Sequence, residues 1–434
     1  MRITIIALGS RGDVQPWIAL GKGLVKEGHA VRLATHLAMA SLVTAYGIEF
    51  SALDDEPAGF FETPGGQQLY EAHGNAFRFA SRLARYLAPS VDIYMQRSLD
   101  ACADADIIMV SHVSLLIGYS VAEKLDRPLI VTFLFPTFLS TTAFPEVTSF
   151  TLPQRPRFLG QALNQLSHVA ARRVFWRLFT PAVNQARQRI AHLPPLPGKP
   201  VVLNALPDHA DLILLCYSSL LLPRPPEWNE TVQITGFCTL NPPENWQPDP
   251  QMVDFLQAGP APIYIGFGSM SSGRFEETFQ MTVAALTELK QRGIILVSSK
   301  YMSDHRFSEQ IYVTTGVPHE WLFPQMSAIV HHGAPGTTAV SLAAGKPTLV
   351  IPHNPDQYFW GARIAALGIG PKPLLRARLS SRKLAARLAQ TLEDQVMRQK
   401  AAALGEKLRQ EDGVAQAIAS LKQKQLLLFL HPLF

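Results

Sequence analysis

Short apolar runs separated by polar turns recur along the first part of the chain. Runs of this kind are typical of buried parallel strands. The segment after the first run carries Trp17, Leu20 and Leu24 at helical spacing, and Pro16 suits the first turn of that helix. Alternating strands and helices predict an α/β domain with a parallel sheet. The predicted strands comprise residues 3–8, 30–34, 107–111 and 129–133.

The same order of elements returns later in the chain. An apolar run at 328–330 breaks into His331-His332-Gly333-Ala334-Pro335-Gly336-Thr337-Thr338, and a helical segment then leads to Gly345. A second apolar run follows at 347–351. A strand, a polar loop, a helix and a second strand make up half of a doubly wound parallel sheet.

The loop between this strand and helix has the chemistry of an anion site. Free amides at a helix N-terminus favour a negative charge by about 0.3 to 1 kcal/mol. His332 adds a donor, and the glycines allow the backbone to approach a ligand closely. The residues suit a diphosphate held without a metal, although the loop lacks the GxxxxGK[ST] pattern of a P-loop.

Two polar residues follow strands of the first predicted sheet. Asp13 comes after the turn Gly9-Ser10-Arg11-Gly12, and His112 comes directly after the run 107–111. Asp13 suits either of two roles, a cap of the helix or a general base. His112 is either a neighbour that tunes this base or a loop histidine with a structural role.

Length and composition indicate an ordered protein of two domains. The chain has 434 residues, of which 47% are hydrophobic and 17% charged, and about 200 residues per domain is a natural size. The Pro-rich stretch at 223–250 indicates a linker. We therefore expect domains at 1–222 and 251–379, with C-terminal helices at 380–434.

Cysteine usage and hydropathy bear on the compartment. The three cysteines have neither metal-site nor CxxC spacing, which favours a reducing cytoplasm. The N-terminus runs directly into the first strand, so we expect no signal peptide. No apolar run approaches the ~18 residues of a membrane-spanning helix.

The net charge of +5 is unevenly distributed. Residues 147–207 contain no Asp or Glu but several arginines, interleaved with apolar residues from Phe158 to Phe179. The segment 155–189 is either a helix that covers a pocket or a surface that docks on an anionic membrane. The apolar tail at 426–430 permits the same two interpretations. We expect no nucleic-acid partner.

Four ordered motifs carry a resemblance to a known family. They are GSRGDVQPWIALGKGL, IYIGFGSM, VPHEWLFPQM and HHGAPGTT, the last followed by AAGKPTLVIPHNPDQYFWGARIAALGIG. Together they resemble the family 1 glycosyltransferases, and among these the sterol and related lipid glucosyltransferases. The resemblance implies two facing Rossmann-like domains of GT-B type with a cleft between them. The acceptor is expected on the first domain, the nucleotide sugar on the second, and the terminal helices back on the first domain.

The resemblance also implies roles for individual residues. Asp13 matches the catalytic position of the first turn. The acid-amide pair Asp356 and Gln357 is expected on the sugar hydroxyls, and backbone near Val317 on the base. The expected donor-binding residues are Gly12, Gly268, Ser269, Val317, His332, Gly333, Gly336, Thr337, Thr338, Asp356 and Gln357. The loop departs from the usual HHGGAGTT at Ala334 and Pro335, and the proline removes an amide donor.

The expected activity is inverting transfer of a hexose, with UDP-glucose as co-substrate, to a hydroxyl of an apolar acceptor. No metal or other cofactor is expected. Sterol, hopanoid, carotenoid, hydroxylated fatty acid and polyketide acceptors all fit the residues. Two other classes stay open, namely a nucleotide-sugar epimerase and a binding protein without turnover. A peripheral location on the inner face of the membrane would suit a lipid acceptor.

Overall fold

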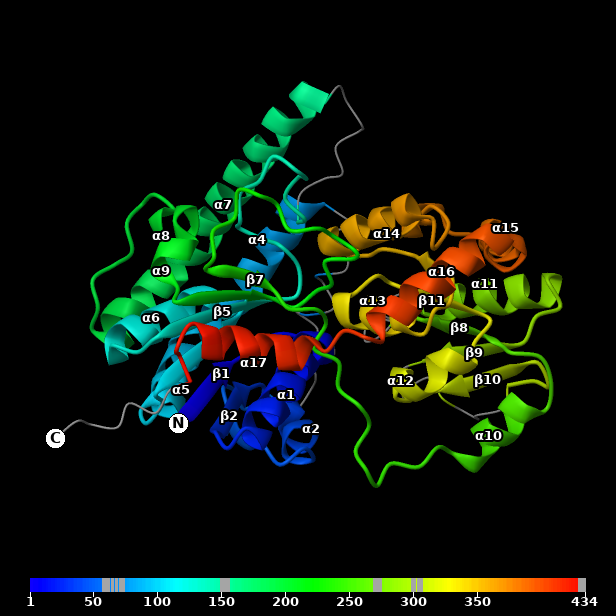
Figure 1. Cartoon of the computed structure of the whole chain (residues 1–434), viewed down its shortest axis with the longest axis horizontal. Coiled ribbons are helices and arrows are strands. Elements are labelled where there is room, and N and C mark those ends of the chain that lie inside the picture. The colour runs from blue at the N-terminus through cyan, green and yellow to red at the C-terminus, as the bar shows by residue number, and fades with distance from the viewer. Residues whose placement is uncertain are drawn as a thin grey trace. The chain divides into compact units, whose positions relative to one another are not determined.

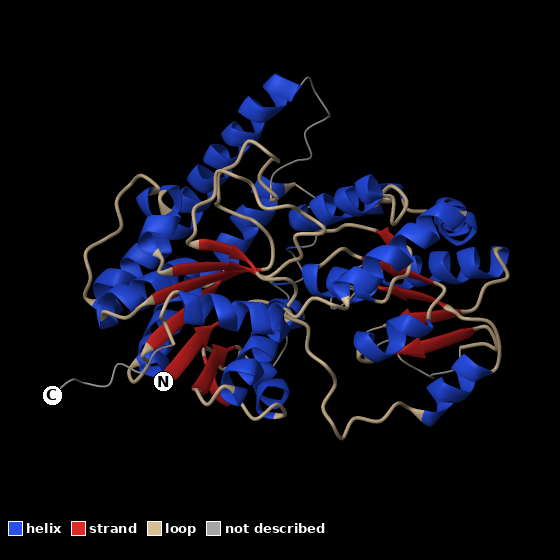
Figure 2. Cartoon of the chain, viewed as in Figure 1, coloured by secondary structure: helices blue, strands red, loops and turns tan. Residues whose placement is uncertain are grey.

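The computed structural model describes residues 1–56, 63, 66, 69, 75–148, 157–267, 275–297, 302 and 307–427, except for the side chains of 157–159 and 275. The described chain divides into two compact units. Residues up to Leu240 form the first unit together with those from Asp412 onward, and Asn241–Glu411 form the second. Each unit is built on a sheet with helices packed on it (Figure 2). The predicted α/β class is confirmed.

The first unit contains a seven-stranded sheet of order β3-β2-β1-β4-β5-β6-β7, in which all pairs are parallel. β1 is an inner strand, with Ile3 beside Val31 on one side and Ile107 on the other. All four runs predicted as strands are strands. Their bounds are β1 (Arg2–Ile6), β2 (Ala30–Thr35), β3 (Glu49–Ala52), β4 (Ile107–Ser111), β5 (Leu129–Phe133), β6 (Leu212–Leu215) and β7 (Val232–Ile234).

The helices of the first unit pack on this sheet and on one another. α1 buries Trp17, Leu20 and Leu24, as the helical spacing predicted. Figure 1 shows the arrangement of these helices. They are α1 (Arg11–Lys26), α2 (Ala40–Thr44), α4 (Ala76–Leu87), α5 (Val91–Cys102), α6 (Leu115–Leu125), α7 (Arg157–Ala186), α8 (Val201–Asn204), α9 (Leu206–His209) and α17 (Gly413–Gln423).

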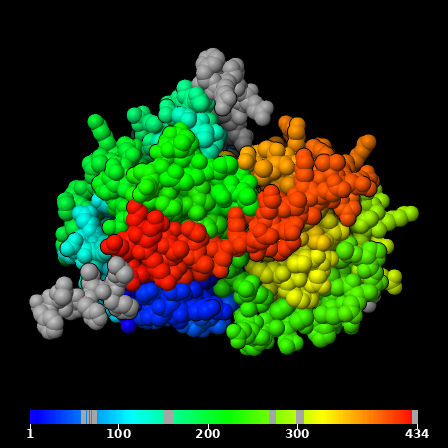
Figure 3. All heavy atoms as spheres, viewed as in Figure 1, coloured from blue at the N-terminus to red at the C-terminus, as the bar shows by residue number. Residues whose placement is uncertain are grey.

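The last described helix, α17, packs on the first. A Cβ at Gly23 of α1 would lie 2.4 Å from Val414 Cγ1, so the glycine permits the close approach. Lys422 pairs with Glu27 at 2.5 Å. Figure 3 shows the red atoms of α17 lying on the blue atoms of the N-terminal segment. The C-terminal helix is therefore part of the first unit's core.

The second unit has a five-stranded parallel sheet of order β10-β9-β8-β11-β12. Its strands are β8 (Ile263–Gly266), β9 (Gly293–Leu296), β10 (Ile311–Thr314), β11 (Ala328–His331) and β12 (Thr348–Val350). Its helices are α10 (Pro250–Gln257), α11 (Phe275–Glu288), α12 (His319–Leu322), α13 (Pro335–Ala343), α14 (Pro355–Leu367), α15 (Ser381–Glu393) and α16 (Gln395–Leu408). β11, α13 and β12 are the strand, helix and strand expected from the sequence.

Two boundaries differ from the sequence-based expectation. The predicted linker 223–250 contains β7, whose buried Val232 pairs it with the first sheet, and the change of unit comes at Leu240. The helices expected to return to the first domain are divided. α15 and α16 stay with the second unit, where Leu384 and Leu388 are buried, and α17 alone returns.

The chain re-enters the first unit close to the point where it left. A Cβ at Gly413 would lie 2.4 Å from the carbonyl oxygen of Phe237. Only glycine therefore fits where the returning segment meets the departing one. None of the helices within the described residues combines the length and apolar content of a membrane-spanning segment.

Candidate active site

A tight turn presents Asp13 at the carboxyl edge of the first sheet. Gly9 has φ +131°, and a Cβ there would lie 2.6 Å from Asp13 Oδ2, so the turn requires glycine. Ser10 caps α1, and its backbone N–H and its hydroxyl both donate to Asp13 Oδ2 at 2.8 Å. Within the described residues, Oδ1 has no hydrogen-bond partner. Asp13 thus braces the start of the helix with one oxygen and leaves the other for a ligand.

The surroundings of Asp13 shift its proton affinity. Burial raises the pKa of the Asp13 carboxyl above its ordinary value, although the hydrogen bonds from Ser10 act in the opposite direction. A base is most effective when its pKa approaches the working pH. The shift therefore makes Asp13 a better proton acceptor than an exposed aspartate.

The histidine linked to this turn is His36, which the sequence analysis missed. The backbone N–H of Gly9 donates to His36 Nε2 at 3.0 Å, and His36 Nδ1 makes a close contact with Asp54 Oδ2. His36 directly follows β2, which pairs with β1. Its place after a neighbouring strand, on the same edge as the turn, was the signal that could have revealed it.

His112 lies in an aromatic environment. Its ring is 5.3 Å from that of Phe135, 5.4 Å from Phe138 and 6.0 Å from Phe175, measured between centroids. Burial lowers the pKa of His112 to about 4, so the ring is neutral at physiological pH. No hydrogen bond within the described residues joins this ring to Asp13. The catalytic role of His112 stays a prediction, whereas its packing role is visible.

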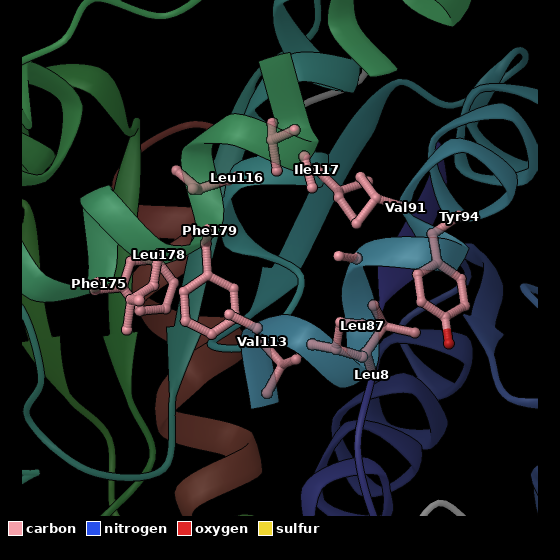
Figure 4. A pocket seen from close by; sticks show the side chains of 14 residues that line it. Leu8, Leu87, Val91, Tyr94, Val113, Leu116, Ile117, Phe175, Leu178 and Phe179 are labelled. Carbon is pink, nitrogen blue, oxygen red and sulfur yellow. The ribbon is translucent and has the colours of Figure 1, made fainter. Parts of the chain in front are cut away.

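An apolar pocket opens beside the turn, at the end of β1. It is bounded by α4, α5, α6 and α7 (Figure 4). Leu8, directly before Gly9, is part of its wall. The other labelled lining residues are Leu87, Val91, Tyr94, Val113, Leu116, Ile117, Phe175, Leu178 and Phe179. The lining therefore favours an apolar ligand, and Leu8 connects the pocket wall to the Asp13 turn.

The basic amphipathic segment forms a wall of this pocket through α7. Two of its arginines are buried and have structural partners. Arg187 binds Glu123 at 3.0 and 3.1 Å, and Arg172 donates to Ser140 Oγ at 2.5 Å. Arg172 and Arg187 therefore cannot contribute to a surface that binds anionic lipids. Arg173 and Arg177 are exposed, Arg155 lies outside the described residues, and docking on a membrane stays a prediction.

In the second unit, the predicted anion loop lies between β11 and α13. Gly333 has φ +95°, and a Cβ there would lie 2.8 Å from Val350 Cγ1, so this position also requires glycine. His331 is structural, because its Nδ1 accepts from the Gly333 N–H at 2.9 Å. His332 is 8% exposed, and among the described residues its Nδ1 has no hydrogen-bond partner. Burial lowers the pKa of His332 to about 4.

The proline that departs from the usual motif occupies the first position of α13. Pro335 suits this position, since the first amide of a helix has no partner inside the helix. The amides of Gly336 and Thr337 remain as the free donors of the first turn. Thr338 is fully buried and its N–H bonds back to Ala334. The donor role of Gly333, Gly336, Thr337 and Thr338 stays a prediction.

The acid-amide pair begins α14 but has an unexpected orientation. Gln357 is 3% exposed, and its side-chain oxygen accepts from the N–H groups of His353 and Asn354 at 2.8 and 3.0 Å. This oxygen caps the helix and is not available to a sugar hydroxyl. Asp356 is only partly buried. Its expected contact with the sugar stays a prediction.

Two buried polar residues next to the pair were not predicted. His353 and Asn354 are each 8% exposed, and within the described part of the chain His353 Nδ1 has no hydrogen-bond partner. The His353 ring lies 6.5 Å from that of His332. Polar side chains therefore gather at the carboxyl edge of β11 and β12.

The other predicted donor-binding residues are more scattered. Val317 packs at the margin of a hydrophobic cluster of the second unit, next to the partly buried Trp321. Gly12 is exposed at the first turn of α1. Gly268 and Ser269 lie outside the described residues. The expected roles of these four residues, Val317 included, are untested.

Two family profiles match separate parts of the sequence. The glycosyltransferase family 28 N-terminal domain matches residues 3–144, and the erythromycin biosynthesis protein CIII-like C-terminal domain matches residues 280–420. The first match contains the Asp13 turn and the second contains the loop at His332. The two candidate regions thus fall in the two matched domains.

Solved structures with the same fold are glycosyltransferases. The kitacinnamycin glycotransferase has a TM-score of 0.68 at 16% identity, covering 98% of each chain. The calicheamicin glycosyltransferase CalG4 has 0.64 at 16% identity, covering 99% of each. At such identities the likeness shows the fold alone, and it confirms the two-domain GT-B architecture.

Relatives that are more similar in sequence than these solved structures are named as sterol glucosyltransferases. The sterol 3-beta-glucosyltransferases UGT80A2 and UGT80B1 of Arabidopsis thaliana are 33% and 31% identical over 96% of this chain, and that of Pichia angusta is 32% identical over 97%. The chain spans 64% and 67% of the plant proteins and 33% of the yeast protein. The chain belongs to the family of glycosyltransferases that includes the sterol 3-beta-glucosyltransferases.

Proposed function

We propose that the protein is an inverting hexosyltransferase that moves glucose from UDP-glucose to the hydroxyl of a sterol or a similar apolar acceptor. One observation carries the proposal. Asp13 has a raised pKa and an oxygen without a partner among the described residues, and it lies five residues after Leu8, which lines an apolar pocket. A proton acceptor beside an apolar pocket suits an apolar alcohol.

The pocket supports an acceptor of this class. Aliphatic and aromatic side chains form its walls, so the rings of a sterol would gain about 25 cal/mol for each Å² of apolar surface they bury. A polar acceptor would lose its hydration there without replacement.

The reaction follows from the position of Asp13. Asp13 Oδ1 takes the proton of the acceptor hydroxyl while the oxygen attacks the anomeric carbon of glucose. The new C–O bond forms as the bond between sugar and diphosphate breaks, and UDP leaves with the bonding electrons. A single displacement inverts the configuration at the anomeric carbon. The hydrogen bonds from Ser10 keep Oδ2 in place and so aim Oδ1.

The departing diphosphate gains negative charge, and the loop before α13 has donors that would stabilise this charge. The free amides of Gly336 and Thr337 and the positive end of the helix dipole favour a diphosphate. His332 is neutral at physiological pH because of its low pKa, and a neutral imidazole can still donate one hydrogen bond. Fixed donors of this kind stabilise developing charge, and removing one typically costs about 10² to 10³ in kcat.

UDP release tests the proposal directly. Purified protein is incubated with UDP-glucose alone, with cholesterol, and with the same sterol lacking its 3-hydroxyl. Release that depends on the hydroxyl, with a glucoside of inverted anomeric configuration, supports the proposal. A hydroxylated fatty acid and a polyketide alcohol define the acceptor class. Release of an altered sugar from UDP-glucose alone, or UDP binding without any turnover, would refute it.

We also propose that the protein collects its acceptor from an anionic membrane surface. α7 lines the pocket with Phe175 and Phe179, and the same helix exposes Leu166, Arg173 and Arg177. Flotation with vesicles that contain or lack anionic lipid tests this contact. Binding that requires anionic lipid, and that Arg173→Glu with Arg177→Glu abolishes, supports it. Equal binding to neutral vesicles would contradict it.

A further inference from the structure

A histidine and an aspartate lie behind the turn that holds the proposed base. His36 Nε2 accepts a hydrogen bond from the Gly9 N–H at 3.0 Å, and His36 Nδ1 contacts Asp54 Oδ2. The other oxygen of Asp54 accepts from the backbone N–H of Leu37 at 3.0 Å. His36 is 4% exposed, and its ring meets the edge of Tyr94 at 6.2 Å. His36 and Asp54 are thus connected, with the histidine buried and the aspartate partly buried.

These contacts define where the proton of His36 lies. Asp54 as a carboxylate only accepts, so Nδ1 carries the hydrogen in this contact. The Gly9 N–H only donates, so Nε2 must offer its lone pair. The ring is therefore neutral with its hydrogen on Nδ1, and Asp54 selects this tautomer. Without the Asp54 carboxylate, the hydrogen of the ring could move to Nε2. In that tautomer Nε2 cannot accept a hydrogen bond from the Gly9 N–H.

The hydrogen bond to Gly9 acts on Asp13 through the backbone. The Asp13 side chain lies directly against Gly9, because an added Cβ there would be 2.6 to 2.9 Å from three of its atoms. Ser10, the next residue, supplies both hydrogen bonds to Asp13 Oδ2. A change in the orientation of the Gly9 peptide would therefore move both donors and turn Oδ1 away from the acceptor.

We infer that His36 and Asp54 form a positioning pair that sets the direction of the Asp13 carboxylate, an inference that rests on the proposed transferase function. The pair does not take the acceptor's proton. Its contribution is geometric, and a displacement of about 1 Å at a reacting group can cost about 10²-fold in rate. Its loss should therefore lower kcat and leave donor binding, which depends on the second unit, unchanged.

Three substitutions of one residue separate the two hydrogen bonds. The side-chain oxygen of His36→Gln reaches as far as Nε2 and can accept from Gly9. His36→Asn can meet Asp54 but cannot reach Gly9, and His36→Leu does neither. We expect kcat to fall about 10- to 100-fold in His36→Asn and His36→Leu and to recover to within about threefold in His36→Gln. The KM for UDP-glucose and the UDP affinity should change less than threefold throughout.

A second measurement does not depend on turnover. Asp13 is observed by its carboxyl ¹³C resonance in labelled protein. We expect His36→Gln to keep the wild-type resonance, and His36→Asn and His36→Leu to shift it because the Ser10 donors move. Thermal unfolding confirms that each variant is folded, and the comparison of His36→Gln with His36→Asn stands even where His36→Leu does not fold.

The outcomes distinguish this inference from the proposed function. Wild-type protein that releases no UDP with any acceptor refutes the transferase, whatever the variants do. Active wild type with His36→Gln no better than His36→Asn refutes the positioning pair. So does a fall in UDP affinity as large as the fall in kcat, or an Asp13 resonance that is the same in all variants.

Discussion

Replacing Asp13 with asparagine removes the proposed base with little change in shape. The amide oxygen of asparagine can take the place of Oδ2 and accept both hydrogen bonds from Ser10, which are 2.8 Å long in the native protein. The turn at Gly9 should therefore persist. The amide nitrogen then occupies the position of Oδ1, where it cannot accept a proton from the acceptor.

The size of the effect follows from what is lost. A positioned base contributes about 10² to 10⁴ in rate, which corresponds to about 2.7 to 5.4 kcal/mol at 1.36 kcal/mol per tenfold. We expect kcat of Asp13→Asn to fall by this factor. The UDP affinity should change less than threefold, since no proposed donor contact of the second unit is altered.

The stability of the variant has a definite sign. Because the pKa of Asp13 is raised, its ionised form is less stable in the folded than in the unfolded state above that pKa. A neutral asparagine lacks this penalty. The free energy of unfolding at pH 7 should be equal to or greater than that of the wild type, and the difference should vanish as the pH falls toward 3.8, the ordinary pKa of aspartate.

Kinetics, calorimetry and urea unfolding check these three expectations. Acceptor-dependent UDP release gives kcat, titration calorimetry gives the UDP affinity, and unfolding at pH 7 and pH 4 gives the stability. Asp100→Asn, an exposed aspartate on α5, is the matched control and should behave as the wild type. Activity within threefold of the wild type, or equal losses of kcat and UDP affinity, would refute the role of Asp13.

Three further expectations concern the pocket and the buried charges. Ala182 lines the pocket from α7, and a phenylalanine there would fill part of the space for the acceptor. Steady-state kinetics of Ala182→Phe should show an acceptor KM raised at least about tenfold and an unchanged UDP affinity. The control Ala170→Phe, on the exposed face of α7, should change neither quantity. Glu146 is 1% exposed and hydrogen-bonded to a buried histidine, so Glu146→Ala should cost about 3 to 5 kcal/mol in urea unfolding, and a loss below 1 kcal/mol would contradict this. Burial lowers the pKa of His112 and His332 from 6.5 to about 4, so each histidine is protonated in the unfolded state at a higher pH than in the folded state. As the pH falls from 6.5 to 4, the free energy of unfolding should therefore decrease by up to about 1.4 kcal/mol per pH unit for each histidine. A flat stability profile over this range would refute it.

The sheets were predictable because the signals that define them are local. Buried parallel strands are continuous apolar runs, and both β1 and β11 have this form. The turn at Gly9 and the loop at Gly333 were visible as glycines between a strand and a helix. β7 was missed because it is short and lies among prolines, which on composition alone predict a linker.

The site was less predictable because its contacts join distant residues. His36 is 27 positions from Gly9, and only the pairing of β2 with β1 brings them together. The segment 155–189 was expected to cover a pocket or to dock on a membrane, but its buried Arg172 and Arg187 bind Ser140 and Glu123 on other elements. Gln357 was expected to face the sugar, and its side-chain oxygen instead accepts from the N–H groups of His353 and Asn354, just before α14.

The close approach of Gly413 to Phe237 makes the second unit an insertion in the first. Residues 241–411 leave and rejoin the first unit at neighbouring points. Insertions whose ends lie close together place little strain on the host, and natural proteins tolerate them at such sites. The second unit can therefore be exchanged as one piece through two neighbouring junctions. A chimera must keep α17 with the first unit, because dividing the chain into two consecutive halves would remove part of that unit's core.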